Sequence, residues 1–221
     1  MTRRRTANLI AWVCLVLCAL TTALLVADEE EWESLFDGKT LKGWKATDFG
    51  GQGEVEVKDG TIVLNIGPGD LTGITWTGPV RRMNYEICVD AMRLSGHDFF
   101  CGLTFPVGDS CCSLICGGWG GTLVGISSFS DMDASENETT TYMDFEDEKW
   151  YPIQVRVTEN HIEAWIDGKK VVDAKPDNRR ISVRGEVTRS QPLGIAAYQT
   201  QAAIGDVRVR TIKPEGEKPE K

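Results

Sequence analysis

The strongest constraint on the fold is the alternation of apolar and polar residues in 151–173, YPIQVRVTENHIEAWIDGKKVVD. A period of two places alternate side chains on opposite faces of a strand, and tight turns join antiparallel neighbours. The turns fall near 159–160 and at 167–168. The segment therefore predicts a three-stranded antiparallel meander. Ile153, Val155 and Val157 alternate on the first strand, Ile162, Ala164 and Ile166 alternate on the second, and the third contains Val171-Val172.

The same period recurs along the chain. Residues 54–66 alternate around an Asp-Gly turn, and 84–94, 192–200 and 202–212 read as further strands. No stretch carries a sustained apolar stripe of helical period, and glycine is frequent at 23 residues. We therefore predict an all-β fold, a sandwich or jelly roll of antiparallel sheets.

The first residues differ from the rest. A basic start with three consecutive arginines precedes an apolar run over 9–26 and a small residue, which is typical of a secretory signal peptide helix. The run is also long enough for an uncleaved membrane anchor, which is the alternative interpretation. We expect contact with a membrane only if the segment is retained in this way. We expect a secreted, periplasmic or cell-surface protein. The predicted organisation is signal peptide 1–27, short lead-in 28–33, one domain 34–212 and disordered tail 213–221.

The net charge limits the classes of ligand and partner that the protein is expected to bind. The formal net charge is −9, and cleavage would remove the three arginines and leave a still more acidic chain. An acidic protein is a poor ligand for nucleic acid or anionic lipid. Small neutral ligands, cations or basic proteins fit better.

Four of the seven cysteines lie in 101–121, CGLTFPVGDSCCSLICGGWGG. The spacing lacks a second ligand pair for zinc, no histidine adjoins a thiol, and the glycine run lacks the Gly-Lys-Ser/Thr of a phosphate loop. A turn centred at 108–109 would place Cys101 opposite Cys116. Either a cross-strand disulfide or two buried thiols would fit. The predicted domain contains five cysteines, Cys88, Cys101, Cys111, Cys112 and Cys116, and their pairing stays open. Because five is an odd number, at least one of them is a free thiol or is linked to a partner protein.

Residues 131–149 are strongly acidic, and we expect an exposed loop around one short strand at 139–145. The start of this segment resembles a calcium loop of the EF-hand, but Glu136 and Tyr142 stand where that loop needs glycine and glutamate. A looser calcium site and a merely solvated loop remain as alternatives, and no metal ligand is assigned. Asn137 begins a glycosylation sequon.

Several polar and aromatic residues are candidates for a site. Trp119 stands between glycines, which suits either stacking on a sugar ring or packing over a sheet edge. Arg156, Glu163 and Trp165 share the polar face of the predicted meander, which indicates a binding groove or a cross-strand ion pair covered by the indole.

The two histidines are weaker candidates. His97 and Asp98 form a polar pair in a predicted loop, which suits an acid, a base or a metal ligand. His161 lies on a tight turn, where a solvated turn residue is expected.

The opening motif LFDGKTLKGW, residues 35–44, resembles the start of the 3-keto-disaccharide hydrolase domain family, which has a concanavalin A-like lectin/glucanase fold. The meander over 149–173 and the closing strands over 192–210 resemble later parts of that family. The resemblance covers roughly 34–212. The chain is a divergent member, because 196–198 reads Ala-Ala-Tyr where the family usually has Gln-Asp-His, and GHDFFCG replaces a central Asn-Ser-Gly.

The resemblance implies a carbohydrate-active protein that acts on glycosides oxidised at C3. The ketone acidifies the C2 proton, so that a base can start elimination of the glycosidic oxygen before water adds. The alternative functions are a non-catalytic glycan- or partner-binding module and a purely structural module. On the catalytic reading, Asp98 or Glu163 would be the base and Arg156 the charge stabiliser. Trp119, Trp165 and Tyr198 would bind the ligand beside them on one concave face.

Overall fold

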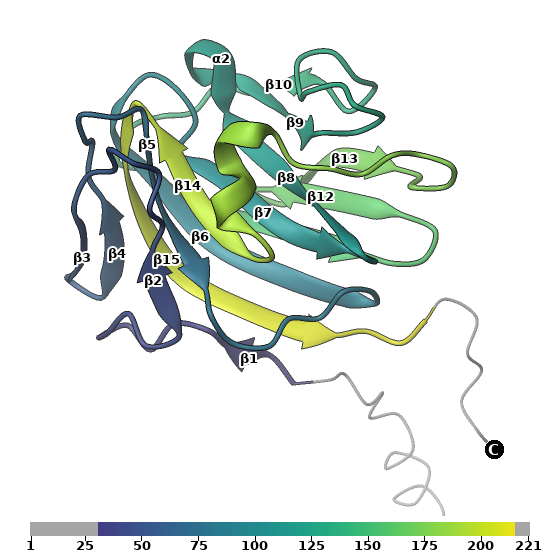
Figure 1. The fold of residues 1–221 in the computed structure, drawn as a ribbon, viewed down its shortest axis with the longest axis horizontal. Coiled ribbons are helices and arrows are strands. Elements are labelled where there is room, and N and C mark those ends of the chain that lie inside the picture. Colours follow the sequence, from purple (N-terminus) through teal and green to yellow (C-terminus); the bar gives the residue numbers. More distant parts are fainter. Residues whose placement is uncertain (1–30, 215–221) are drawn as a thin grey trace, which may run out of the picture. The chain divides into compact units, whose positions relative to one another are not determined.

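The computed structural model describes residues 31–214, which form two antiparallel β-sheets and two short helical turns (Figure 1). The predicted all-β sandwich is confirmed. The predicted signal peptide, half of the lead-in and most of the tail lie outside the described residues, so these boundaries stay predictions. Within the described part, no helix has the length and hydropathy needed to cross a membrane.

Sheet A has the strand order β13-β12-β11-β6-β15-β4-β3, and β1 pairs with β15 beside it. The meander predicted over 151–173 is present, with Val155 opposite Ala164 and a bulge after Ala164. The long strands β6 and β15 run side by side through the middle of the sheet (Figure 1). The strands are β1 Glu33–Ser34, β3 Val55–Lys58, β4 Thr61–Leu64, β6 Tyr85–Gly96, β11 Trp150–Val157, β12 Ile162–Ile166, β13 Lys169–Ala174 and β15 Thr200–Thr211.

Sheet B has the order β10-β9-β8-β7-β14-β5-β2. Its central hairpin turns at 108–109, where Gly108 has φ 57. Val107 pairs with Ser110, and this register places Cys101 directly opposite Cys116, as the sequence predicted. The strands are β2 Trp44–Ala46, β5 Leu71–Trp76, β7 Cys101–Val107, β8 Ser110–Gly117, β9 Leu123–Ser127, β10 Thr141–Tyr142 and β14 Gly194–Tyr198. The helical turns are α2 Gly118–Gly121 and η2 Gly185–Ser190.

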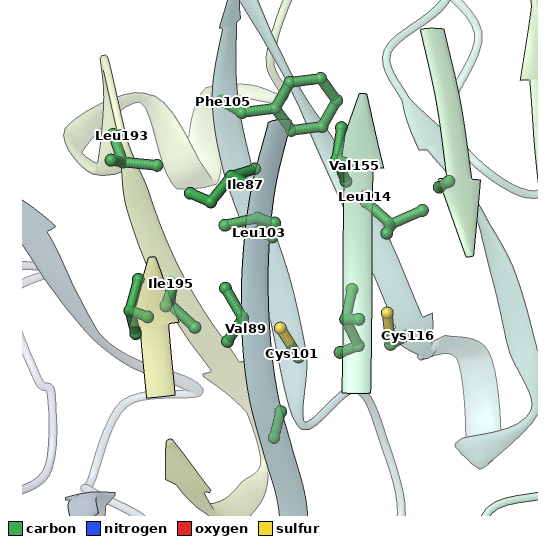
Figure 2. Close-up of a cluster of buried hydrophobic side chains, with 14 of the residues drawn as sticks. Ile87, Val89, Cys101, Leu103, Phe105, Leu114, Cys116, Val155, Leu193 and Ile195 are labelled. Carbon is green, nitrogen blue, oxygen red and sulfur yellow. The ribbon is translucent and has the colours of Figure 1, made fainter. Parts of the chain in front are cut away.

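The core lies between the inner faces of the two sheets (Figure 2). Ile87 and Val89 of β6 meet Leu103 and Phe105 of β7, and all four side chains are almost completely buried. In both strands every second residue points into this core, as the period-two pattern requires, although β7 is buried along its whole length. The outer face of each sheet is therefore left to the intervening residues.

Cys101 and Cys116 point into this core as free thiols, so the structure has the second of the two arrangements predicted for them (Figure 2). Burial raises the pKa of the Cys116 thiol well above its usual value, and a hydrogen bond with Cys101 adds to the effect. A thiol that stays protonated is a poor nucleophile and behaves as a small apolar side chain. The other three cysteines of the described chain are also free.

The acidic segment 131–149 corrects one prediction, because part of it packs into the protein. Its only strand is the short β10, and Asn137 is just 6% exposed. The Asn137 amide donates to the carbonyl oxygens of Ile126, Met132 and Asp133 at 2.8, 3.2 and 2.7 Å. The sequon asparagine is therefore a buried structural residue. The prediction of an exposed loop was wrong at this position because it rested on the acidity of the neighbouring residues.

Candidate functional site: a cavity on the outer face of sheet B

A cavity of about 690 Å³ lies on the outer face of sheet B. On β8, Leu114 and Cys116 point into the core, so that Ser113 and Ile115 face outward into the cavity. Its size is typical of small-ligand sites. The lining residues are Phe49, Gly50, Gly51, Gly69, Asp70, Leu71, Asp98, Phe99, Ser113, Ile115, Trp119, Ser127, Arg184, Glu186, Val187 and Tyr198.

The base of the cavity is apolar. A second hydrophobic cluster, separate from the core between the sheets, gathers Leu71, Phe99 and Ile115 on this outer face. The ring of Tyr198 stacks on Phe99 with centroids 5.7 Å apart and planes inclined by 28°. Flat aromatic surfaces of this kind suit the apolar face of a sugar ring.

Trp119 forms part of the cavity's wall from α2, which follows β8. Its indole is 45% exposed, which is unusual for so large an apolar side chain. The guanidinium of Arg184 lies over the indole, 5.8 Å from the ring centroid. Trp119 therefore lines the cavity with an accessible indole, and its contact with a ligand stays a prediction.

Asp70 and Tyr198 form a polar pair at the cavity. The Tyr198 hydroxyl donates to Oδ2 of Asp70 at 3.3 Å, and the Gln199 amide donates to Oδ1 at 2.8 Å. Partial burial, then the negative charge of Asp70, raises the pKa of Tyr198. The phenol therefore stays protonated at neutral pH and can donate a hydrogen bond.

Sequence reasoning missed Asp70. The available signal was its place in the turn GPGD, directly before strand β5. Only the pairing of β5 with β14 brings it beside Tyr198, which lies 128 positions away along the chain.

Two further carboxylates lie at the cavity, and both are already engaged. Asp98 accepts hydrogen bonds from the backbone N–H groups of Phe99 and Gly120 at 2.8 and 3.3 Å. Glu186 accepts from Arg184 at 2.8 Å, and this contact lowers the pKa of the Glu186 carboxyl. The cavity thus combines aromatic surfaces with acidic groups.

Arg156, Glu163 and Trp165 lie elsewhere. Glu163 and Trp165 alternate along β12 with residues buried between the sheets, so they point outward from sheet A. The cavity is on the outer face of sheet B, on the opposite side of the sandwich. The expectation of one concave face for all six candidates is corrected: the structure brings together Asp98, Trp119 and Tyr198 and leaves the other three apart.

An ion-pair network explains the second group. Arg156 contacts the fully buried carboxylate of Glu86 at 2.5 Å, and Arg210 contacts its other oxygen at 2.7 Å. Glu163 is bound by Lys170 at 2.5 Å and lies 3.6 Å from Arg156. The cross-strand ion pair that the sequence offered as the alternative is therefore present, and Trp165 lies against Arg156, 5.3 Å from the guanidinium.

The histidines and the acidic loop hold no metal-binding group. His161 contacts Asp173 at 2.8 Å on sheet A, and His97 is not among the residues that line the cavity. Asp131 and Asp133 pair with Arg180 and Arg184. Across residues 31–214, no three His, Cys, Asp or Glu side chains are grouped closely enough to bind an ion.

Two antiparallel sheets packed as a jelly-roll sandwich, with a cavity on an outer sheet face, are characteristic of concanavalin-like glycosidases and lectins. Residues 31–213 match the model of the 3-keto-alpha-glucoside-1,2-lyase-like domain. The chain belongs to this family, which confirms the resemblance seen in the sequence.

Solved structures share the fold. A Crh5 transglycosylase is 13% identical with a TM-score of 0.60, covering 86% of this chain and 87% of that one. A glycosyl hydrolase of Parabacteroides distasonis, so described provisionally, is 15% identical with a TM-score of 0.52, covering 82% and 94%. The carbohydrate-binding module CBM66 of Bacillus subtilis is 13% identical with a TM-score of 0.50, covering 76% and 96%. A comparison with curated proteins found no match.

Proposed function

We propose that this chain is an exported carbohydrate-active enzyme that binds a 3-keto-glycoside in the cavity of sheet B and cleaves it by elimination. The observation that carries the proposal is the convergence of Phe99, Trp119 and Tyr198 with Asp70 in one cavity. Membership of the lyase-like family supports the reaction class. The fold shared with a transglycosylase and a carbohydrate-binding module supports a carbohydrate as the ligand.

The chemistry begins with the acidic proton at C2, next to the C3 ketone. A base removes it, and the electron pair of the C–H bond passes into an enolate. The enolate then forms the C1–C2 double bond while the bond from C1 to the glycosidic oxygen breaks, and that oxygen takes up a proton. Addition of water across the double bond releases the free 3-keto sugar. The reaction therefore needs a base near C2 and a donor near the C3 oxygen.

Asp70 and Tyr198 fit these two roles better than the residues chosen from sequence. The Asp70 carboxylate is exposed and lines the cavity, whereas Asp98 is occupied by two backbone N–H groups and Glu163 lies on the other sheet. Tyr198, held in its neutral form, can turn its hydroxyl from Asp70 to an oxygen on which negative charge develops. Asp70 would act as the base and Tyr198 as the donor.

The test is turnover of 4-nitrophenyl 3-keto-α-glucoside, followed by the release of nitrophenolate. Asp70→Asn should lower kcat by about 10²- to 10⁴-fold, the usual contribution of a general base. Glu163→Gln is the matched control, since it removes an equal charge from the opposite face. Full turnover by Asp70→Asn, or loss of turnover in Glu163→Gln alone, would contradict the assignment.

A non-catalytic glycan-binding module is the second candidate. One observation favours it: Asp70, Asp98 and Glu186 all accept hydrogen bonds from the protein itself. This function predicts affinity for an unoxidised glycoside that is lost in Trp119→Ala, with no turnover of the 3-keto substrate by the unsubstituted protein. Export is tested separately, by sequencing the N-terminus of the protein recovered outside the cytoplasm, where cleavage after Ala27 is expected.

A further inference from the structure

The loop that carries Trp119 has an unusual backbone. Trp119 has φ 47 and ψ 53, and Gly117, Gly120 and Gly121 also have positive φ. Left-handed geometry is strained for a bulky residue, so surrounding contacts must hold it. One such contact is close packing, because a Cβ added to Gly121 would lie 3.1 Å from Nη1 of Arg93.

Asp98 supplies a second contact. Oδ2 of Asp98 accepts from the backbone N–H of Gly120, next to Trp119, and Oδ1 accepts from the N–H of Phe99. The backbone of Asp98 is itself fixed, since its N–H donates to Oγ1 of the buried Thr200 at 3.1 Å. The carboxylate thus links the Trp119 loop to the connection between β6 and β7 that carries Phe99, the residue stacked on Tyr198.

Arg184 holds the indole from a different segment. Its guanidinium lies over Trp119, and it is tied down by Glu186 at 2.8 Å and Asp133 at 3.0 Å. The indole is therefore fixed through its backbone by Asp98 and through its ring by Arg184. An aromatic surface held in place before the ligand arrives loses less conformational freedom on binding.

We infer that Asp98 is a positioning residue that fixes Trp119 as the stacking surface for the sugar, and that it does not take the substrate's proton. This inference rests on the proposed function, because it assumes a glycoside in the cavity. It also follows from geometry, since both carboxylate oxygens of Asp98 already accept backbone N–H groups. Asp98 then acts on binding through Trp119, whereas Asp70 acts on the chemical step.

A double-mutant cycle tests this link, with the dissociation constant for 4-nitrophenyl α-glucoside as the readout. Trp119→Ala and Asp98→Ala should each weaken binding by about tenfold. The double variant should bind no more weakly than Trp119→Ala, because Asp98 acts only through the indole. Additive losses, or unchanged affinity in Asp98→Ala, would overturn the inference.

Controls separate charge from position. Asp48→Asn removes a carboxylate that pairs with Arg189 and does not contact the Trp119 loop, so it should leave the affinity unchanged. Asp98→Asn keeps one acceptor oxygen and should show a smaller loss than Asp98→Ala. With the 3-keto substrate, Asp98→Ala should raise KM while kcat and its pH profile stay the same. A fall in kcat with a changed pH profile would show Asp98 to be a base instead.

Hydrogen exchange gives a readout that needs no ligand. Asp98→Ala should accelerate amide exchange in residues 117–121, and unchanged exchange there would overturn the link between Asp98 and the loop. Absence of glycoside binding in the unsubstituted protein would overturn the proposed function and the role of Trp119 as a sugar surface. The exchange measurement therefore tests the contact between Asp98 and the loop, whereas the affinity measurement tests whether the cavity binds a sugar.

Discussion

Glu86→Ala should destabilise the protein without affecting the cavity. Glu86 is 0% exposed in the centre of sheet A, and its two oxygens receive the guanidinium groups of Arg156 and Arg210 at 2.5–2.7 Å. Removing one partner of a buried ion pair costs about 3–5 kcal/mol, because the remaining charge is left without compensation. The side chains of Arg156 and Arg210 are 37% and 20% exposed, so they can regain part of their hydration. We therefore expect the low end, about 3 kcal/mol.

Urea unfolding of the protein, followed by tryptophan fluorescence, measures this loss, and the melting temperature should fall by about 6–12 °C. Glu146→Ala is the control. Its ion pair with Lys149 is exposed on both sides, so its removal should leave the free energy of unfolding almost unchanged. A Glu86→Ala protein as stable as the unsubstituted chain, or one whose glycoside affinity changed, would refute the structural role assigned to this face.

Three further predictions concern other parts of the chain. Asn137→Ala should lower the free energy of unfolding by about 2 kcal/mol, because it removes the hydrogen bonds that a buried amide donates to the carbonyl oxygens of Ile126 and Asp133, and urea unfolding measures this. Hydrogen bonds from the N–H groups of Thr40 and Lys39 lower the pKa of Asp37 below its usual 3.8, so Asp37 stabilises the fold above that pH and loses this effect as the pH falls through the folded-state pKa. The stability difference between the unsubstituted protein and Asp37→Asn should therefore be constant above about pH 5 and shrink in acid; a constant difference would contradict it. Alkylation of the unfolded, unreduced protein should label both Cys101 and Cys116. Detection of a disulfide-linked peptide that contains both residues would contradict the prediction that they are free thiols.

Local patterns were enough to predict the fold class. Alternation over 151–173 requires one buried face, and a strand meets that requirement whatever its neighbours are. The turn at 108–109 placed Cys101 opposite Cys116 for the same reason, since the register of a hairpin follows from its turn. The motif at 35–44 was specific enough to indicate the family.

The site could be predicted only in part. Trp119 was recognisable because glycines isolate it along the chain. Arg156 and Glu163 carry the same polar pattern as a binding face, and nothing in a strand's alternation says which outer face bears the cavity. Asp70 gave little signal, because its significance depends on the pairing of β5 with β14.

The sequence by itself determined the all-β fold class, the strands and turns of the meander and of the central hairpin, and the family. These depend on residues close together along the chain, where periodicity and turn chemistry act. The tertiary structure decided which sheet bears the cavity, that Asp70 meets Tyr198 and that Asp98 is taken up by the Trp119 loop. Those relations join residues far apart in the sequence, and they arise only when strand order and sheet packing bring them together in space.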